Sequence, residues 1–135
     1  MSLVTDILRN NHTFAVVGVS QDPAKYGHEI FETLLAKGYR ALPVNPKYET
    51  VDGHRCYASL EALPEKPDVV VAVVPPAVTE KIVETTARLG VRTIWMPPGA
   101  WSDRAIELCE QNGLTEIHDV CLVFALRSFH PSETQ

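Results

Sequence analysis

Residues 13–19 read Thr13-Phe-Ala-Val-Val-Gly-Val19, and this run decides the fold class. The run is apolar from Phe14 to Val17 and is broken by Gly18. It is too short for a buried helix, and its unbroken apolar character is typical of a strand with both faces covered. We therefore predict a central strand of a parallel sheet, followed by a glycine turn.

The rest of the chain continues as apolar strands separated by helices. Further strands are expected at Arg40–Val44, Val69–Val74, Arg92–Met96 and Leu114–His118. Apolar residues at helical spacing predict helices over Leu3–Asn11, Glu29–Lys37, Ala77–Leu89 and the segment from the N-cap Ser102 to Gly113. Strands that alternate with helices imply right-handed βαβ units. The expected fold class is α/β: a Rossmann-like, doubly wound, five-stranded, mainly parallel sheet with helices on both faces.

Length and composition fit one ordinary domain. The chain has 135 residues, of which 45% are apolar and 21% charged, so disorder and coiled coil are not expected. We assign residues 1–126 to a single Rossmann-like domain and residues 127–135 to a polar C-terminal tail.

Charge and cysteine usage narrow the classes of partner. The net charge of −5 argues against a nucleic-acid-binding protein, because such proteins usually present a basic surface. The longest apolar run, Val69–Ala77, is too short to span a membrane. The three cysteines form neither a disulfide framework nor a C-x-x-C pair, so a reducing cytoplasm is the expected location.

Ligands of such sheets bind outside the carboxyl ends of the strands, where the strand order reverses. The expected site therefore lies among the segments that follow the strands: Gly18–Lys25, Asn45–Lys47, Val74–Ala77, Met96–Trp101 and His118–Cys121.

The loop after the first strand departs from the dinucleotide-binding pattern G-x-G-x-x-G. Ser20 and Pro23 occupy its second and third glycine positions, and the second strand ends without the acidic residue that would hold a ribose diol. NAD therefore remains an alternative ligand, although the sequence lacks both of these features. Gly18, the hydroxyl of Ser20, the following helix N-terminus and Lys25 would nevertheless suit a phosphate. A plain strand-to-helix turn with a solvated lysine explains the loop equally well.

A set of short motifs occurs in order between Phe14 and Phe124. They are Gly18-Val19-Ser20 with Pro23 and Lys25, Gly38-Tyr39-Arg40, Pro43-Val44-Asn45-Pro46, Val74-Pro75-Pro76, Trp95-Met96, Pro98-Gly99-Ala100 and Asp119-Val120-Cys121. The ordered set resembles the small CoA-binding domain proteins and, more distantly, the CoA-binding domain of the succinyl-CoA synthetase α subunit.

The resemblance implies that coenzyme A or an acyl-CoA lies across the strand ends. It assigns the pyrophosphate to Gly18, Val19 and Ser20, with Lys25 as a phosphate partner and Arg40 as a basic residue near the nucleotide phosphate. It assigns the adenosine and pantetheine path to Val44, Asn45, Pro46, Val74, Pro75 and Pro76, with Met96 at the end of the fourth strand. The missing carboxylate after the second strand agrees with this, because a carboxylate would repel the 3′-phosphate of CoA, whereas Arg40, Lys25 or Lys47 would attract it.

One departure and one reactive residue leave alternatives open. Pro97 stands where many relatives have glutamine, which removes a side chain able to hydrogen-bond a ligand. Cys121, close to His118 and Asp119, is the candidate nucleophile, although a free cysteine more often packs as a small apolar residue. The five histidines show no metal-binding spacing, so no metal is expected.

Three functions follow from these observations. The leading one is a non-catalytic CoA carrier, sensor or regulatory protein. The alternatives are a small NAD(P)-binding or CoA-linked enzyme that uses Cys121, and an interaction module without a ligand. Association into a homo-oligomer, or with a protein partner, is left open.

Overall fold

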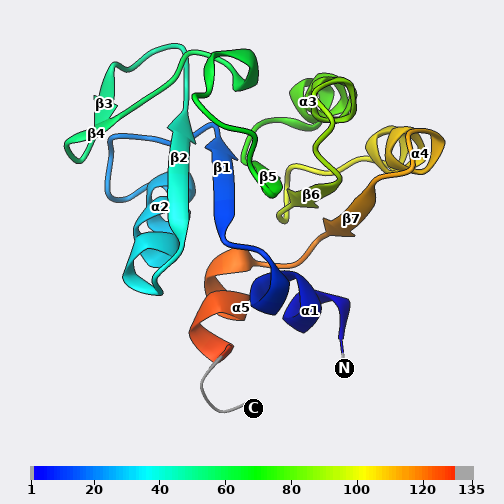
Figure 1. Cartoon of the computed structure of the whole chain (residues 1–135), viewed down its shortest axis with the longest axis horizontal. Coiled ribbons are helices and arrows are strands. Elements are labelled where there is room, and N and C mark those ends of the chain that lie inside the picture. The colour runs from blue at the N-terminus through cyan, green and yellow to red at the C-terminus, as the bar shows by residue number, and fades with distance from the viewer. Residues whose placement is uncertain (1, 130–135) are drawn as a thin grey trace.

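The computed structural model describes residues 2–129 and is built around a five-stranded sheet. The strands are β1 (Thr13–Val17), β2 (Arg40–Val44), β5 (Val69–Ala72), β6 (Thr93–Met96) and β7 (Thr115–His118). Their order is β2-β1-β5-β6-β7, and every neighbouring pair is parallel. Helices cover both faces (Figure 1), so the predicted α/β fold class is confirmed.

Strand β1 is buried over its whole length, as the apolar run predicts. Phe14 and Val16 pack into the core on one face, while Ala15 and Val17 pack into the core on the other. The chain passes from β1 to β2 on one side and then crosses to β5 on the other. The strand order therefore reverses between β1 and β5, which makes this crevice the topological switch point.

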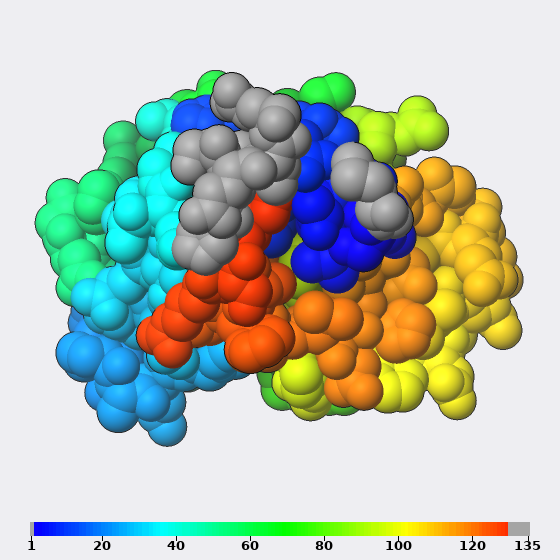
Figure 2. Space-filling model, turned by 90° about the horizontal axis from the view of Figure 1, so that it is seen from below, coloured from blue at the N-terminus to red at the C-terminus, as the bar shows by residue number. Residues whose placement is uncertain are grey.

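The helices form one layer on each face of the sheet. The first layer contains α1 (Leu3–Asn10), α2 (Tyr26–Ala36) and α5 (Leu122–Ser128), and the second contains α3 (Pro76–Arg88) and α4 (Asp103–Gln111). Figure 2 shows α1 and α5 side by side on the surface of the first layer. In the described part of the chain, no helix is both long and apolar enough to cross a membrane.

The predicted N-cap at Ser102 is confirmed in atomic detail. Ser102 caps α4, and its hydroxyl accepts a hydrogen bond of 3.0 Å from the amide of Ala105. Trp95 is fully buried, and its indole Nε1 donates to the carbonyl of Val120 at 2.9 Å.

The structure adds elements that the sequence reading leaves as loop. They are a hairpin of β3 (Thr50–Val51) and β4 (His54–Arg55), a 3₁₀ turn η1 (Leu60–Ala62), and α5. The expected domain boundary at residue 126 falls inside α5, and Phe129 is buried beyond it. The folded part therefore extends at least three residues further, while residues 130–135 of the predicted tail lie outside the described residues.

The open edge of β2 is partly covered by the chain that follows the hairpin. The amide of Tyr57 donates to the carbonyl of Pro43 at 2.9 Å, and the amide of Asn45 donates to the carbonyl of Tyr57 at 2.9 Å. Pro43 has no N–H to donate, and its nitrogen faces the same open edge as its carbonyl. A proline there removes no hydrogen bond between β2 and β1.

Candidate ligand-binding site

A cavity of about 380 Å³ lies at the switch point, above the carboxyl ends of β1, β2 and β5. The arrowheads of β1 and β2 in Figure 1 point to this edge. The ends of the three strands and the segments that follow them line one part of it, the chain around η1 lines another, and α3 closes one side. Its lining includes Gly18, Val44, Asn45, Pro46, Lys47, Ser59, Val74, Val78 and Ile82.

Two neighbouring depressions extend this cavity along the carboxyl edge. One of about 400 Å³ shares Val74 with it and runs between Pro75-Pro76 and Pro97-Pro98. The other, of about 740 Å³, shares Pro46 and Lys47 and reaches the β3–β4 hairpin. The three hollows together make an elongated path rather than one compact pocket.

The turn at Gly18 is fixed by the close approach of β1 and β5. Gly18 has a φ of +91°, and a Cβ there would lie 2.1 Å from the carbonyl oxygen of Val73. A Cβ on Gly27, in the first turn of α2, would lie 2.7 Å from the carbonyl oxygen of Gly18. Glycine at both positions lets the start of α2 pack directly on the turn at the rim of the cavity.

The loop between β1 and α2 is organised by its own side chains. The hydroxyl of Ser20 accepts from the amide of Asp22 at 3.0 Å, and the carboxylate of Asp22 accepts from the amide of Ala24 at 2.9 Å. Lys25 is the N-cap of α2, but no side chain caps this helix. The positive end of the α2 dipole and the exposed Lys25 ammonium therefore lie on the same side of the site.

Asn45 joins the loops that follow β1 and β2. Its Nδ2 donates to the carbonyl of Val19 at 2.8 Å, and its Oδ1 accepts from the amide of Lys47 at 2.9 Å. Both ends of the side chain are thus used within the protein. Asn45 shapes the wall of the cavity, and its main contribution is to hold the two loops together.

Basic side chains gather at the hairpin end of the path. Lys47 lines both the central cavity and the hollow beside the hairpin, and Arg55 lines the latter. The Arg55 guanidinium lies 5.4 Å from the centre of the Tyr57 ring, in cation–π contact. Glu49 also lines this hollow, so the two basic side chains outnumber one carboxylate, and this end suits an anionic group next to an aromatic one.

Comparison with known proteins gives the family. The family model described as "CoA binding domain" matches residues 12–127. This chain belongs to the CoA binding domain family. That match covers the whole sheet and all the hollows described above.

Members and relatives of this CoA binding domain family differ in size. The uncharacterized protein YneT of Bacillus subtilis is 28% identical over 126 residues, which are 90% of each chain. A hypothetical protein of Pyrococcus horikoshii superposes with a TM-score of 0.88 at 31% identity, covering 92% of this chain and 87% of the other. The α subunit of the ADP-forming acetate–CoA ligase II of Pyrococcus furiosus is 32% identical over 66% of this chain, which spans only 20% of that subunit.

Within this CoA-binding fold, the site expected from the sequence comes together only in part. Gly18, Val44, Asn45, Pro46 and Val74 line the central cavity. Pro75 and Pro76 line the adjoining hollow. Val19, Ser20 and Lys25 lie in the loop that enters α2, beside the cavity rather than in its lining.

The expected placement of Arg40 is wrong. Arg40 begins β2, so it lies at the amino edge of the sheet, whereas the cavity lies at the carboxyl edge. Its guanidinium pairs with the carboxylate of Glu65. Arg40 is the first residue of the strand predicted at Arg40–Val44, so the strand direction already placed it at the amino edge, and the role implied by the resemblance did not agree with that position.

The expected role of Met96 in binding the ligand is also wrong. Its side chain is fully buried in the core between the sheet and the layer of α3 and α4, and it lines neither cavity. The residue ends β6 as predicted, but helices cover both faces of the sheet, so its side chain packs under α3 and α4 and does not reach the strand-end crevice.

The proposed partnership of Cys121 with His118 is absent from the geometry. The Sγ of Cys121 accepts from the hydroxyl of Tyr26 at 3.3 Å, and the same hydroxyl oxygen accepts from the amide of Leu122 at 3.2 Å. Burial and the contact with Cys121 raise the pKa of Tyr26 well above its usual range. Nδ1 of His118 instead lies 2.8 Å from the carboxylate of Glu116, and its ring packs against Trp101.

Several residues that line the hollows are not predicted as site residues from the sequence. They are Arg55 in the hairpin, Tyr57 just after it, and Val78 and Ile82 on α3. The dipeptide Asp52-Gly53 is a usable signal for the hairpin, because this pair favours a tight two-residue turn. No comparable signal identifies the α3 residues, since an apolar side chain on a helix reads as core.

Proposed function

We propose that this chain binds coenzyme A along the carboxyl edge of the sheet and acts as a carrier or sensor without catalysing a reaction. The observation that carries the proposal is the cavity at the switch point, which continues over Val74 into the hollow beside Pro75-Pro76. An elongated ligand with a nucleotide at one end and a narrow arm at the other suits this shape. Membership of the CoA binding domain family supports the choice of ligand.

The charges suggest how the ligand is oriented. The pyrophosphate is assigned to the rim formed by Gly18, Ser20 and the uncapped start of α2, with Lys25 as its counter-ion. The 3′-phosphate is assigned to Lys47, which takes the role expected of Arg40. The pantetheine arm then follows Val74 toward the hollow between the two proline pairs, where an acyl group would also lie.

A non-catalytic role is favoured over an enzyme built on Cys121. A cysteine nucleophile needs a base that removes its proton. The Tyr26 hydroxyl donates to Sγ, and its raised pKa keeps it protonated at neutral pH, so it cannot accept the thiol proton. A cytoplasmic location fits this role and the three free cysteines.

Calorimetric titration of the full chain tests the ligand. CoA should bind, dephospho-CoA should bind at least about tenfold more weakly because a charge-assisted contact is lost, and NAD should not bind. Absence of CoA binding at concentrations well above micromolar would refute the proposal. Incubation with acetyl-CoA should leave the thioester intact, and turnover that disappears in Cys121→Ser would contradict the non-catalytic role.

A further inference from the structure

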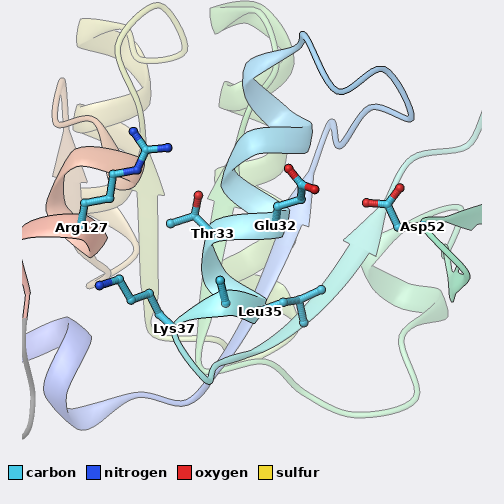
Figure 3. Close-up of a pocket in the computed structure, with 7 residues that line it drawn as sticks. Glu32, Thr33, Leu35, Lys37, Asp52 and Arg127 are labelled. Atoms are coloured by element: carbon cyan, nitrogen blue, oxygen red, sulfur yellow. The ribbon is translucent and has the colours of Figure 1, made fainter.

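A second hollow lies away from the strand ends. A groove of about 680 Å³ runs between α2, α5 and the β3–β4 hairpin. Figure 3 shows Glu32 and Asp52 at one end of it, and Lys37 and Arg127 at the other. The proposed CoA path includes neither end of this groove, so its acidic end calls for a separate explanation.

His28 contributes a buried imidazole to the acidic end. His28 and Glu32 are four residues apart on α2, which places them on the same face of the helix. Nε2 of His28 lies 2.7 Å from Oδ2 of Asp52, and Nδ1 lies 3.5 Å from Oε1 of Glu32. One ligand atom from each of the three residues can be chosen so that all lie within 4.8 Å of one another.

The imidazole is buried but makes no hydrogen bond. Its side chain is only 2% exposed, and neither ring nitrogen has a hydrogen-bond partner. Oδ2 of Asp52 is close enough to accept a hydrogen bond. It forms none because it lies away from the direction in which a ring N–H would point. Buried polar groups are nearly always satisfied, so an unsatisfied imidazole facing two carboxylates needs an explanation.

We propose that His28, Glu32 and Asp52 form a site for a divalent transition-metal ion, with Zn²⁺ as the preferred ion. Ligands held about 2.0–2.2 Å from one ion point at the ion and not at each other, which accounts for a short N···O distance without a hydrogen bond. An imidazole with two carboxylates suits Zn²⁺, whereas Mg²⁺ and Ca²⁺ prefer oxygen ligands alone.

The burial pattern fits an open, three-ligand site. Glu32 and Asp52 are 61% and 45% exposed, so their carboxylates have room to adjust around an ion and to leave positions for water. Two carboxylates also supply the negative charge that a divalent cation requires. The ion would join α2 to the turn between β3 and β4. Nε2 of Gln21, in the loop before α2, donates to the carbonyl of Thr50 in β3 at 2.8 Å and contacts the same hairpin.

Calorimetric unfolding of the full chain, stripped with chelator, tests the site. Added Zn²⁺ should raise Tm, Mg²⁺ should not, and chelator should reverse the effect. Asp52→Asn and Glu32→Gln should each weaken Zn²⁺ binding at least about tenfold, since even the loss of an outer-shell partner costs that much. Glu84→Gln, which alters an exposed carboxylate on α3, should keep the full effect of the metal.

The two carboxylate variants are preferred to a change at the buried His28, which could prevent folding. Comparison of each variant with and without metal separates lost coordination from a weakened turn. The proposal is overturned if Zn²⁺ leaves the Tm of the original chain unchanged. It is equally overturned if the Zn²⁺ effect persists in Asp52→Asn and Glu32→Gln, or if it disappears only when a cysteine is replaced.

Discussion

Gly18 shows how a single residue can serve the fold and the site together. Its positive φ and its approach to the backbone of Val73 exclude any side chain. A branched side chain there would therefore distort the sheet itself, whether or not a ligand binds nearby. Loss of ligand binding in a Gly18 variant is not evidence for a pyrophosphate contact.

Gly18→Ala should lower the free energy of unfolding by more than about 3 kcal/mol, because the new Cβ meets a backbone carbonyl and the φ is also unfavourable. Gly38→Ala is the matched control: its φ is +88°, but nothing lies within 4 Å of the new Cβ. That variant should lose only about 1 kcal/mol. Urea unfolding of both proteins measures the difference, and equal losses would contradict the role of the close approach.

Lys47 and Arg40 make a matched pair for the 3′-phosphate assignment. Lys47→Ala should weaken CoA at least about tenfold and affect dephospho-CoA much less, because only CoA offers the phosphate. Arg40→Ala should leave both affinities unchanged, since Arg40 lies at the opposite edge of the sheet. Calorimetric titration of the two variants with the two ligands gives the four values. An equal loss for both ligands in Lys47→Ala would contradict the assignment.

At the scale of elements, α5 and its C-cap residue carry two phenylalanines with opposite environments. Phe129, just past the end of the helix, is 7% exposed and packs in the core with α1 and α2, whereas Phe124 is 72% exposed. Phe129→Ala should reduce the free energy of unfolding by about 3 kcal/mol, and Phe124→Ala should change it by less than about 0.5 kcal/mol. Chemical denaturation checks both, and similar effects would show that α5 does not close the core.

The regular elements were predictable because burial on both faces leaves a strong pattern. The bounds of β2 agree with the prediction, and those of the other strands and of α1, α3 and α4 agree to within two residues, since their apolar periods end in Gly, Pro or a cap. The hairpin was missed because strands of two residues are too short to show a period. α5 was missed because its helix lies between segments that read as a strand end and a polar tail.

The position of the site was predictable from the sequence, but several of its residues were not. The turns after β1, β2 and β5 follow from the rule for parallel sheets, and Gly18, Asn45 and Val74 lie there. The assignment of Arg40 failed because the first residue of a parallel strand lies at the amino edge of the sheet, and that of Met96 failed because its side chain packs into the core. The four-residue spacing places His28 and Glu32 on one face of α2, but Asp52 joins them only when the hairpin folds onto the helix, and no spacing in the sequence reveals that contact.

At the scale of the whole molecule, burial of Cys109 predicts how stability changes in alkali. Burial, followed by the neighbouring Glu116 and Glu110, raises the pKa of Cys109 from 9.0 to about 12. Between these values the unfolded chain releases the thiol proton while the folded chain keeps it. The contribution is fully present below pH 9 and falls by up to about 1.4 kcal/mol per pH unit as the pH rises toward 12.

Urea unfolding from pH 8 to 11 should therefore show a shallower decline in Cys109→Ala than in the unmodified chain. Each protein is compared with its own value at pH 8, which removes the packing cost of the substitution. Identical slopes would show that the Cys109 thiol does not contribute to alkaline unfolding.

The covered edge of β2 has a consequence for how copies of the chain meet. An unprotected outer strand offers a row of backbone groups on which another polypeptide can lay a new strand, the usual route to sheet polymers. Here Pro43 has no N–H to offer, and its carbonyl already accepts a hydrogen bond from the amide of Tyr57. Concentrated solutions of the folded protein should accordingly resist fibre growth from this side.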